Sequence, residues 1–432
     1  MIRLFLQRRR ALLGAMSRAS VLVLLLAYSD VAIAQRARAF SIFLDCSAFY
    51  CEPDFYRTDI GFVDHVRERT AADVHVLITR QNTGGGGNAF VLAFYGQQRF
   101  AGINDTLTTI TAQGATEDEE RRALSRTVKL GLARYLARTT DGGRTLVSVE
   151  PADTSAAAQS TIHDPWNAWV FRVGLNGNLS RERDFSNNYI YGSVNASRVT
   201  DAWKTNVRIS ENYRDQGFTF NGERITSVLR DYSGAVQQVR SLGDHWSAGL
   251  RAGAGSSTYL NQHLFVNGGP ALEYNVYPYK ESTRHVLSFL YSAGVRHFLY
   301  EDTTVYFRKR ETLPYESLAM NLAEKQKWGS LSLEVNGAHY LNDLGKSRLT
   351  FSPEADVRLI KGLSLNLFGR YTVLHDQLYL PKGQLTREEV LLRQSQAATS
   401  YTAFLYLGIS YTFGSVFNNV VNPRFSSPSS EF

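Results

Sequence analysis

From Trp166 onward, apolar and polar residues alternate along the chain. In "VFRVGLNGNLS", Phe171, Val173 and Leu175 alternate with polar residues or glycine, and the same period of two recurs in "LSLEVNGA", "LTFSPEADVRL", "LSLNLFGRYTV" and "LYLGISYTF". Successive side chains of a strand point to opposite faces of a sheet, so each segment predicts a strand with one apolar and one polar face.

The alternation predicts about twelve strands. Their expected ranges are 167–180, 187–199, 203–216, 225–240, 245–258, 263–277, 284–299, 315–327, 329–341, 347–360, 363–377 and 402–414. Short connections such as "TDAW", "KWGS" and "IKGLS" contrast with longer polar ones such as "RERDFSNN", "YEDTTVYFRKRETLP" and "LPKGQLTREEVLLRQSQAATS". Short turns at one end, long loops at the other and an even strand number are typical of outer-membrane barrels.

We therefore predict a mainly β fold, in which a small α+β domain precedes a transmembrane antiparallel β-barrel of about twelve strands over residues 166–414. The composition agrees, because 24 Phe and 23 Tyr occur together with a mean hydropathy of only -0.24. Barrel strands hide lipid-facing residues among polar ones, and their rims carry aromatic residues. A secreted or periplasmic all-β binding protein with a sandwich fold would alternate in the same way, and it stays open as an alternative.

Residues 1–34 predict an export signal. They combine an Arg-rich start, the apolar core "VLVLLLAY" and a small-residue end at Ala32-Ile33-Ala34. Arg8-Arg9-Arg10 can be read as a twin-arginine signal, but the strong apolar core favours ordinary export. Removing residues 1–34 deletes five Arg and one Asp, so the formal charge of +7 falls by 4 to +3. That small excess argues against a nucleic-acid partner.

Residues 35–138 predict a small α+β domain. The strand pattern "FSIFLDC" is followed by a helix for which Asp54 is the expected cap and in which Tyr56, Ile60, Val63 and Val66 share a face. Strands follow at "DVHVLITR", "AFVLAFYG" and "TLTTIT". A second helix begins with the capping box Thr116–Glu119 and repeats Leu124, Val128, Leu132 and Leu136 on one face. Residues 139–165 read as a linker with one short strand at "TLVSVE", and residues 415–432 as a tail.

Four consecutive glycines, Gly84, Gly85, Gly86 and Gly87, lie between two apolar runs and raise the question of a phosphate-binding loop. Such a loop needs a helix and usually a Lys-Ser or Lys-Thr pair after it, and "NAFVLAFYG" offers neither. The segment predicts a β-hairpin with the glycines at its tip.

Cys46 and Cys51 are the two cysteines of the chain. An exported protein meets an oxidising compartment, so a local disulfide is the favoured interpretation and a pair of buried thiols is the alternative. Two cysteines cannot build a structural zinc site, and the sequence predicts no metal site or cofactor. Asp45, Asp54, Arg57 and Asp59 lie close by; a helix cap and surface ion pairs are favoured for them over a polar site.

The chain resembles bacterial outer-membrane β-barrel proteins with an amino-terminal periplasmic domain. The signal, residues 166–414 and the aromatic-ended strand "YLGISYTFGSVFNN", with Tyr411 and Phe413, carry the resemblance. It implies an outer-membrane location, contact with outer-membrane lipid, insertion by the outer-membrane insertion machinery and a first domain in the periplasm. The order of elements in that domain loosely resembles small domains of Tol-translocation and curli-secretion proteins, which suggests a periplasmic protein partner. The "GSVFNNVVNPRFSSPSSEF" extension past the last strand departs from the pattern.

Charged residues at alternate strand positions are expected to face the barrel lumen, because charge on the lipid side is costly. They are Arg172, Arg208, Arg251, Glu273, Arg296, Glu334, Glu354, Asp356, Arg358 and Arg370. A plugged interior of paired charges and a hydrated, weakly selective pore both fit this set. The predicted function is a passive channel, or a structural platform with a periplasmic docking domain.

An enzyme is not expected. No Gly-x-Ser-x-Gly or His-Glu-x-x-His motif occurs, and the nine histidines are scattered. His285 and His297, twelve residues apart in "HVLSFLYSAGVRH", are interpreted as a pair at the rim rather than as metal ligands.

Overall fold

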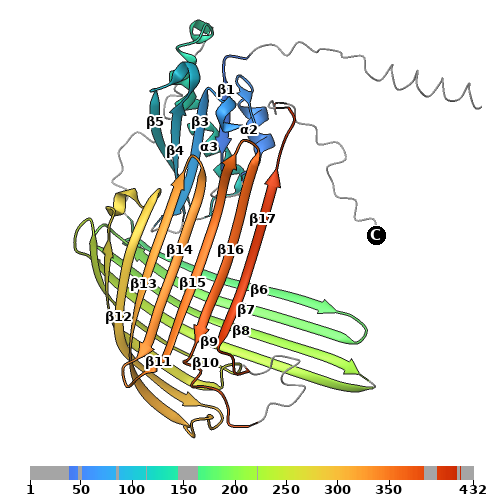
Figure 1. The fold of residues 1–432 in the computed structure, drawn as a ribbon, viewed down its shortest axis with the longest axis vertical. Coiled ribbons are helices and arrows are strands. Elements are labelled where there is room, and N and C mark those ends of the chain that lie inside the picture. Colours follow the sequence, from blue (N-terminus) through green and yellow to red (C-terminus); the bar gives the residue numbers. More distant parts are fainter. Residues whose placement is uncertain are drawn as a thin grey trace, which may run out of the picture. The chain divides into compact units, whose positions relative to one another are not determined.

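The computed structural model describes residues 38–46, 51–83, 87–112, 114–144, 164–220, 222–383, 397–415 and 419. Residues 39–432 form one compact unit in which a small α+β domain precedes a large antiparallel sheet (Figure 1). No helix in these ranges combines the length and the apolar character needed to cross a membrane.

The large sheet contains all twelve predicted strands. Its order follows the sequence, and each strand pairs antiparallel with the next. The strands are β6 (Trp169–Arg181), β7 (Phe185–Val199), β8 (Trp203–Phe220), β9 (Glu223–Ser241), β10 (Trp246–Ser257), β11 (Gln262–Asn275), β12 (His285–Tyr300), β13 (Arg310–Gln326), β14 (Gly329–Tyr340), β15 (Asp343–Ile360), β16 (Leu363–Leu374) and β17 (Tyr401–Tyr411). Strands β6 and β17 are the two edges, and no ladder between described residues joins them.

The connections alternate between two ends of the sheet. The entry end, where the chain enters β6 and leaves β17, carries the turns at 200–202, 242–245, 276–284, 327–328 and 361–362. The distal end carries those at 182–184, 221–222, 258–261, 301–309, 341–342 and 375–400. The expected contrast in loop length is thus confined to 375–400, because β6 to β9 extend into residues expected to be loops and the entry-end connection 276–284 is as long as the distal connection 301–309.

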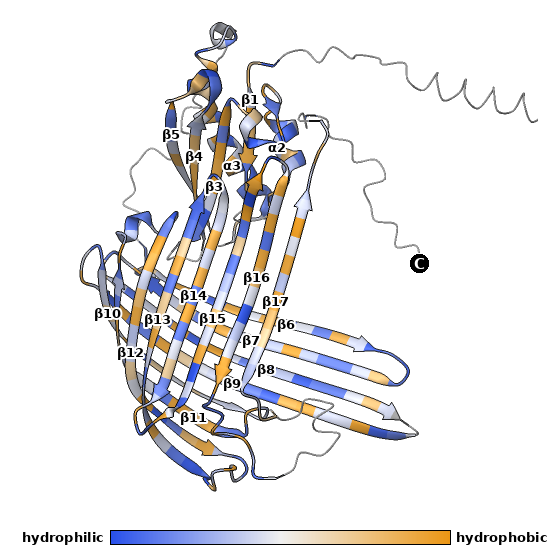
Figure 2. Ribbon diagram, in the orientation of Figure 1, coloured by the Kyte–Doolittle hydropathy of each residue, from blue (hydrophilic) through white to orange (hydrophobic). Residues whose placement is uncertain are grey.

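The sheet has a polar and an apolar face. Following the cross-strand partners from β6 to β16 puts all ten charged residues expected in the lumen on one face, here called the polar face. The other, apolar face carries large hydrophobic side chains across every strand, and Figure 2 shows the alternation along the arrows. Many of them are exposed, among them Val173, Leu175, Ile209, Val236, Leu250, Leu272, Val295, Leu318, Leu349, Leu405 and Ile409.

The α+β domain is built on a five-stranded sheet of order β2-β1-β3-β4-β5. Its strands are β1 (Ser41–Asp45), β2 (Asp64–His65), β3 (Val74–Asn82), β4 (Asn88–Gly96) and β5 (Asn104–Thr111), and its helices are α2 (Pro53–Asp59) and α3 (Glu117–Leu136). Strand β1 lies parallel to β2 and β3, whereas β3, β4 and β5 are antiparallel. The core is fully enclosed, with Ile42, Val76, Leu92 and Val128 at 0% exposure.

One of the two expected helix caps is correct. At α3, Glu119 N donates to Thr116 Oγ1 (3.2 Å) and Thr116 N donates to Glu119 Oε2 (2.7 Å), which is the predicted capping box. The Asp54 cap is wrong: Glu52 is the N-cap of α2 and Pro53 its first residue, so Asp54 lies in the first turn. Proline is favoured at that position, which moves the helix start.

Gly131 of α3 lets the helix approach β4 closely. A Cβ at this position would lie 2.1 Å from the ring of Phe94, which is completely buried. Overpacking of this kind costs up to about 3 kcal/mol, and the better helix propensity of alanine returns only about 1 kcal/mol.

We predict that Gly131→Ala lowers the free energy of unfolding of the α+β domain by about 2 kcal/mol. The measurement is the urea midpoint of the full chain, followed by hydrogen exchange in β3 and β4. Gly114→Ala is the control, because a Cβ there meets nothing within 4 Å. A variant at Gly131 as stable as this control would contradict the close packing.

Candidate functional site

A cavity of about 680 Å³ lies on the polar face towards the distal end. Three of the ten predicted charged residues line it, Arg296, Glu334 and Arg370. Neutral hydrogen-bonding side chains such as Asn267, Asn336 and Thr372 line it as well, and so do apolar ones such as Phe265, Phe298 and Leu378. Such a mixed surface can hold water and small polar or charged solutes.

The cavity is covered by residues 375–383, here called the capping segment. Leu378 and Tyr379 are buried against the polar face, in a small apolar cluster with Phe298, Tyr300, Leu313 and Tyr340. The sequence predicted a strand up to residue 377 and a long polar connection from Leu380 to Ser400. Instead β16 ends at Leu374 and the residues after it fold onto the sheet, while residues 384–396 lie outside the described residues.

Hydrogen bonds hold the capping segment to two other distal loops. Asn261 Nδ2 donates to Tyr379 O (3.0 Å), and Val305 N donates to Leu380 O (2.8 Å). Thr304 forms a β-bridge with Pro381. These bonds satisfy backbone groups that would otherwise be buried without partners, so the segment is an integral part of the fold.

Charges in the distal cavity are partly paired. Arg348 Nε donates to Asp376 Oδ2 (3.1 Å), which ties β15 to the capping segment. The guanidinium of Arg296 lies 4.1 Å from the centre of the Tyr315 ring, a cation–π contact. The sequence did not indicate Arg348 and Asp376 as residues of this cavity, because the role of each depends on how the capping segment folds.

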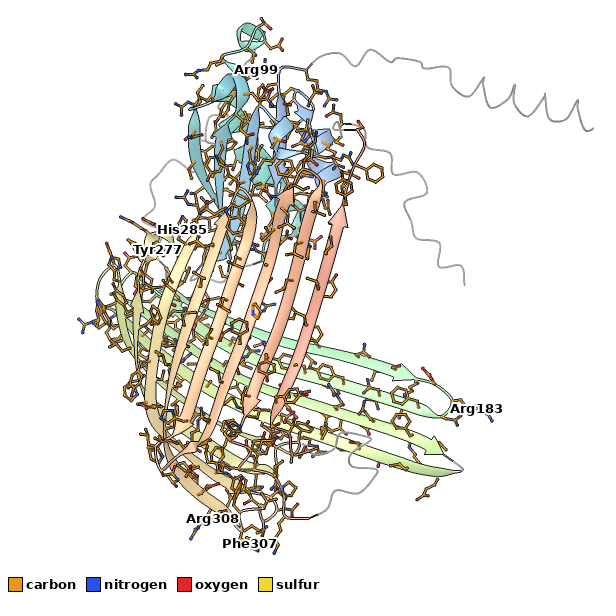
Figure 3. The ribbon with its side chains drawn as sticks, in the orientation of Figure 1. Arg99, Arg183, Tyr277, His285, Phe307 and Arg308 are labelled. Atoms are coloured by element: carbon orange, nitrogen blue, oxygen red, sulfur yellow. A yellow bond between two sulfur atoms is a disulfide. The ribbon has the colours of Figure 1, made fainter. Side chains whose placement is uncertain are left out.

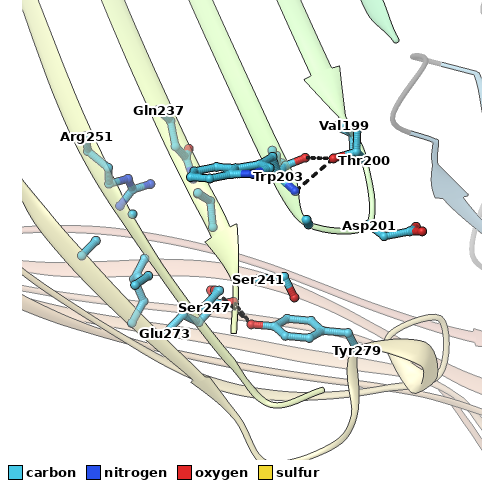
Figure 4. A pocket seen from close by; sticks show the side chains of 17 residues that line it. Val199, Thr200, Asp201, Trp203, Gln237, Ser241, Ser247, Arg251, Glu273 and Tyr279 are labelled. Atoms are coloured by element: carbon cyan, nitrogen blue, oxygen red, sulfur yellow. Dashed lines mark hydrogen bonds between the residues drawn. The ribbon is translucent and has the colours of Figure 1, made fainter. Parts of the chain in front are cut away.

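A second cavity, of about 420 Å³, lies on the polar face at the entry end. Arg251 and Glu273, two more of the predicted residues, line it together with Trp203 (Figure 4). Tyr279 closes one side, and its hydroxyl lies within hydrogen-bond distance of Ser247 Oγ (3.0 Å) and Glu273 Oε1 (3.1 Å). The polar face thus has a cavity near each end of the sheet.

The remaining predicted residues lie outside these cavities. Arg172 and Arg208 are exposed on β6 and β8, near the β6 edge. Glu354, Asp356 and Arg358 follow one another along β15 towards the entry end. The register therefore gathers the ten residues on one face, but it does not bring them into one site.

Arg358 binds the α+β domain. Its Nη1 and Nη2 donate to Asp45 Oδ2 (2.7 Å) and Oδ1 (2.8 Å), and its guanidinium lies 5.1 Å from the centre of the Phe43 ring. Asp45 Oδ2 also lies 3.0 Å from His75 Nε2, and the side chains of Asp45 and His75 are completely buried. A two-pronged Arg–carboxylate pair fixes orientation as well as distance.

In this cluster of Arg358, Asp45 and His75, the arginine and the aspartate form an ion pair and the histidine ring is neutral. Burial alone would raise the pKa of Asp45, but hydrogen bonds from His75 and Arg358 hold it well below its usual range. Burial lowers the pKa of His75, although the Asp45 carboxylate opposes that shift. Asp45 is therefore ionised and His75 neutral, with Nε2 donating to the carboxylate.

The other acidic residues near the cysteines behave as surface groups. Asp54 pairs with Arg57 one turn along α2, and Asp59 pairs with Lys129 of α3 (2.9 Å). The interpretation as surface ion pairs is correct for these residues and wrong for Asp45.

The Cys46–Cys51 disulfide is confirmed, with the Cα atoms 6.1 Å apart. The hairpin is confirmed as well: β3 and β4 pair up to Asn82 opposite Asn88, and Thr83 N donates to Gly87 O (2.8 Å). The tip glycines Gly84, Gly85 and Gly86 lie outside the described residues, as does the short strand expected at "TLVSVE".

The two histidines of β12 are not brought together. His285 Nδ1 lies 2.7 Å from Glu324 Oε2, and its ring centre is 5.5 Å from that of Tyr277, beside it at the entry end (Figure 3). His297 Nδ1 lies 2.7 Å from Thr312 Oγ1, further along the strand. Each has its own partner on β13.

No protein-family model matches the chain, and a comparison with curated proteins finds no significant similarity. The fold is that of a mainly β protein, in which a small α+β domain is followed by a large antiparallel sheet with one apolar and one polar face.

We predict that the α+β domain loses stability as the pH falls from 8 to 5, and that His75→Gln removes most of this dependence. Folding lowers the pKa of His75, whereas in the unfolded chain a histidine keeps its ordinary pKa of about 6.5. Below that pH the unfolded chain therefore binds more protons than the folded protein, which lowers the free energy of unfolding. The contribution of Asp45 is fully present above about pH 3.9 and is lost only below it, because the folded state lowers that pKa too.

The measurement is hydrogen exchange in β1 and β3 of the full chain at several pH values. His263→Gln is the control, because His263 is an exposed residue of β11. An unchanged pH dependence in His75→Gln would contradict the neutral buried ring.

Proposed function

We propose that the chain is an integral outer-membrane β-barrel protein. In this proposal its polar face lines a narrow passive channel, and its α+β domain is a docking platform in the periplasm. The observation that carries it is the uncovered apolar face. Leu175 is 78% exposed and Ile409 69%, on strands at opposite edges of the sheet. A soluble protein rarely exposes so extended an apolar surface, whereas lipid covers one without cost.

The two sheet edges support closure into a barrel. Strands β6 and β17 each have one partner, and an open edge presents a row of unpaired backbone groups. Because the number of strands is even, β6 and β17 run in opposite directions, so the same antiparallel pairing can join them. Only closed barrels and helices satisfy every backbone group in a bilayer.

The charges agree with this orientation. All ten predicted residues lie on the polar face, where a closed barrel would put them in the lumen, away from lipid. The capping segment narrows the distal end, and Arg–carboxylate pairs occupy part of the interior. These features favour a channel of low conductance for small polar solutes.

The expected sidedness follows from the chain ends. The export signal would deliver the α+β domain to the periplasm, and the chain enters β6 and leaves β17 at the same end of the sheet. The Gly84–Gly87 tip would then lie in the periplasm, where backbone without side chains can approach a protein partner closely. The capping segment would lie at the cell surface.

A secreted or periplasmic binding protein with a sandwich fold has less support. In a sandwich, a second sheet covers the apolar face of the first. Within the described residues the only other sheet belongs to the α+β domain, and its core is already complete.

We predict that Leu333→Arg impairs the barrel and that Asn336→Arg does not. Leu333 faces Leu322 and Pro353 on the apolar face, so an arginine there should cost about 2 to 4 kcal/mol if it lies near the bilayer midplane. Asn336 lines the distal cavity, which has room for the longer side chain.

The measurements are outer-membrane fractionation and the heat-dependent shift in gel mobility that folded barrels show. Equal behaviour of the two variants, or a wild-type protein that fractionates as soluble, would argue against a lipid-facing surface.

We also predict that replacing Leu378 and Tyr379 by serine raises the single-channel conductance in a planar bilayer by on the order of twofold, because it loosens the capping segment. The control is Leu341→Ser, since Leu341 is a half-exposed residue of a distal turn outside this cluster. Equal conductance of the double variant and wild type would mean that the capping segment does not limit the channel.

A further inference from the structure

Three polar side chains stand in one row across the apolar face. Glu316 of β13 is the direct cross-strand partner of His339 of β14, and His339 is the partner of Ser347 of β15. Directly opposed residues of antiparallel strands project from the same face, with Cβ atoms roughly 4.5 to 5.5 Å apart. A carboxylate, an imidazole and a hydroxyl are therefore neighbours on a surface that is otherwise largely apolar.

The carboxylate and the imidazole are already bonded. His339 Nε2 lies 3.0 Å from Glu316 Oε1, and Tyr291 of β12 donates to Glu316 Oε2 (2.5 Å). Strands β13 and β15 flank β14 on opposite sides, so with Nε2 bonded to β13 the other ring nitrogen, Nδ1, is left for a partner on β15. In the part of the chain that the structure describes, Ser347 Oγ makes no hydrogen bond, which leaves it available to this nitrogen.

A β-bulge sits beside Ser347. His339 pairs with Ser347 but the next residue, Tyr340, pairs with Asp343, so residues 344–346 are extra on β15. Bulges re-aim neighbouring side chains and are over-represented next to active sites. This one interrupts the β14–β15 ladder directly beside Ser347.

The row borders a depression of about 460 Å³ on the apolar face. Its floor includes Gly337, and Leu318 and Leu349 are the cross-strand partners of that glycine on either side. Glycine between two leucines leaves a shallow apolar groove. It has the shape and the surface to take a hydrocarbon chain.

We propose that Ser347, His339 and Glu316 form a hydrolase site for ester-linked acyl chains of membrane lipids; this rests on the proposal that the apolar face meets lipid. Ser347 Oγ attacks the ester carbonyl carbon and gives its proton to His339 Nδ1. His339 returns that proton to the leaving alcohol oxygen as the ester C–O bond breaks. Water then attacks the acyl-serine with His339 as base, which releases a fatty acid and restores Ser347.

Glu316 acts as the positioning residue. It orients the ring through Nε2 and stabilises the imidazolium that forms in each step, while Tyr291 holds the carboxylate in place. A polar cluster that merely decorated the barrel rim would need no nucleophile and would leave no covalent adduct. Adduct formation at Ser347 therefore separates the two roles.

The test uses full-length protein in detergent micelles that contain a diacyl phospholipid. A fluorophosphonate probe should label Ser347, as located by mass spectrometry, and free fatty acid should be released. Ser347→Ala should lose the label and lower hydrolysis by about 1,000-fold or more. His339→Gln should have a similar effect, and Glu316→Gln should lower the rate by about 100-fold.

Ser332→Ala is the control, because Ser332 lies on the same strand as His339 but on the polar face. It should label and turn over like wild type. Every variant is compared at equal amounts of protein that shows the heat-dependent mobility shift, so that misfolding is not mistaken for lost chemistry. Unlabelled folded wild type, or turnover that survives Ser347→Ala, would overturn the hydrolase site and leave the membrane proposal intact. Equal behaviour of Leu333→Arg and Asn336→Arg would instead contradict the membrane proposal, whatever the result of the labelling.

Discussion

The large sheet depends on one constraint, which is that its apolar face has to be kept from water although the described residues supply no second layer for it. The α+β domain solves the same problem internally: its two helices and five strands enclose residues such as Ile42 and Val76 completely. In the twelve-stranded sheet, Leu175 and Ile409 remain mostly exposed. The hydrophobic effect that folds the first domain therefore does not hold the second together by itself, and the proposed lipid environment would supply the missing contact.

The ten charged residues predicted for the lumen all lie on the polar face of the sheet. The backbone ladders hold the strands, while the two ends are fixed by side chains. At the distal end, Leu378 and Tyr379 build a small apolar core on the polar face, and Arg348 binds Asp376 beside it. At the entry end, Arg358 reaches the buried Asp45 of the α+β domain. A buried carboxylate left without that arginine would be costly, so the contact couples the domain to the sheet.

Period-two alternation is local, which is why all twelve strands could be predicted within a few residues and all ten charged residues fell on one face. Contacts between segments that are far apart in the sequence could not be predicted in this way. Asp45 and Arg358 are more than three hundred residues apart, and nothing in "LDCSAFYC" indicates a partner on β15. Pro53 displaced the expected cap at Asp54. The apolar "LYL" inside the polar "HDQLYLPKG" was the one available signal for the capping segment.

The same limit applies to the proposed hydrolase site, which no sequence motif indicates. Motifs are read along the chain, but Glu316, His339 and Ser347 meet across three strands, and a shift of one residue in either pairing would send one of them to the other face. A charged group on the lipid side costs most near the bilayer midplane and little near its surfaces. His339 lies one residue from the end of β14, where that cost is small. In the proposed barrel, a polar row at this depth would meet both ester groups and water, which is the boundary that hydrolysis of a lipid requires.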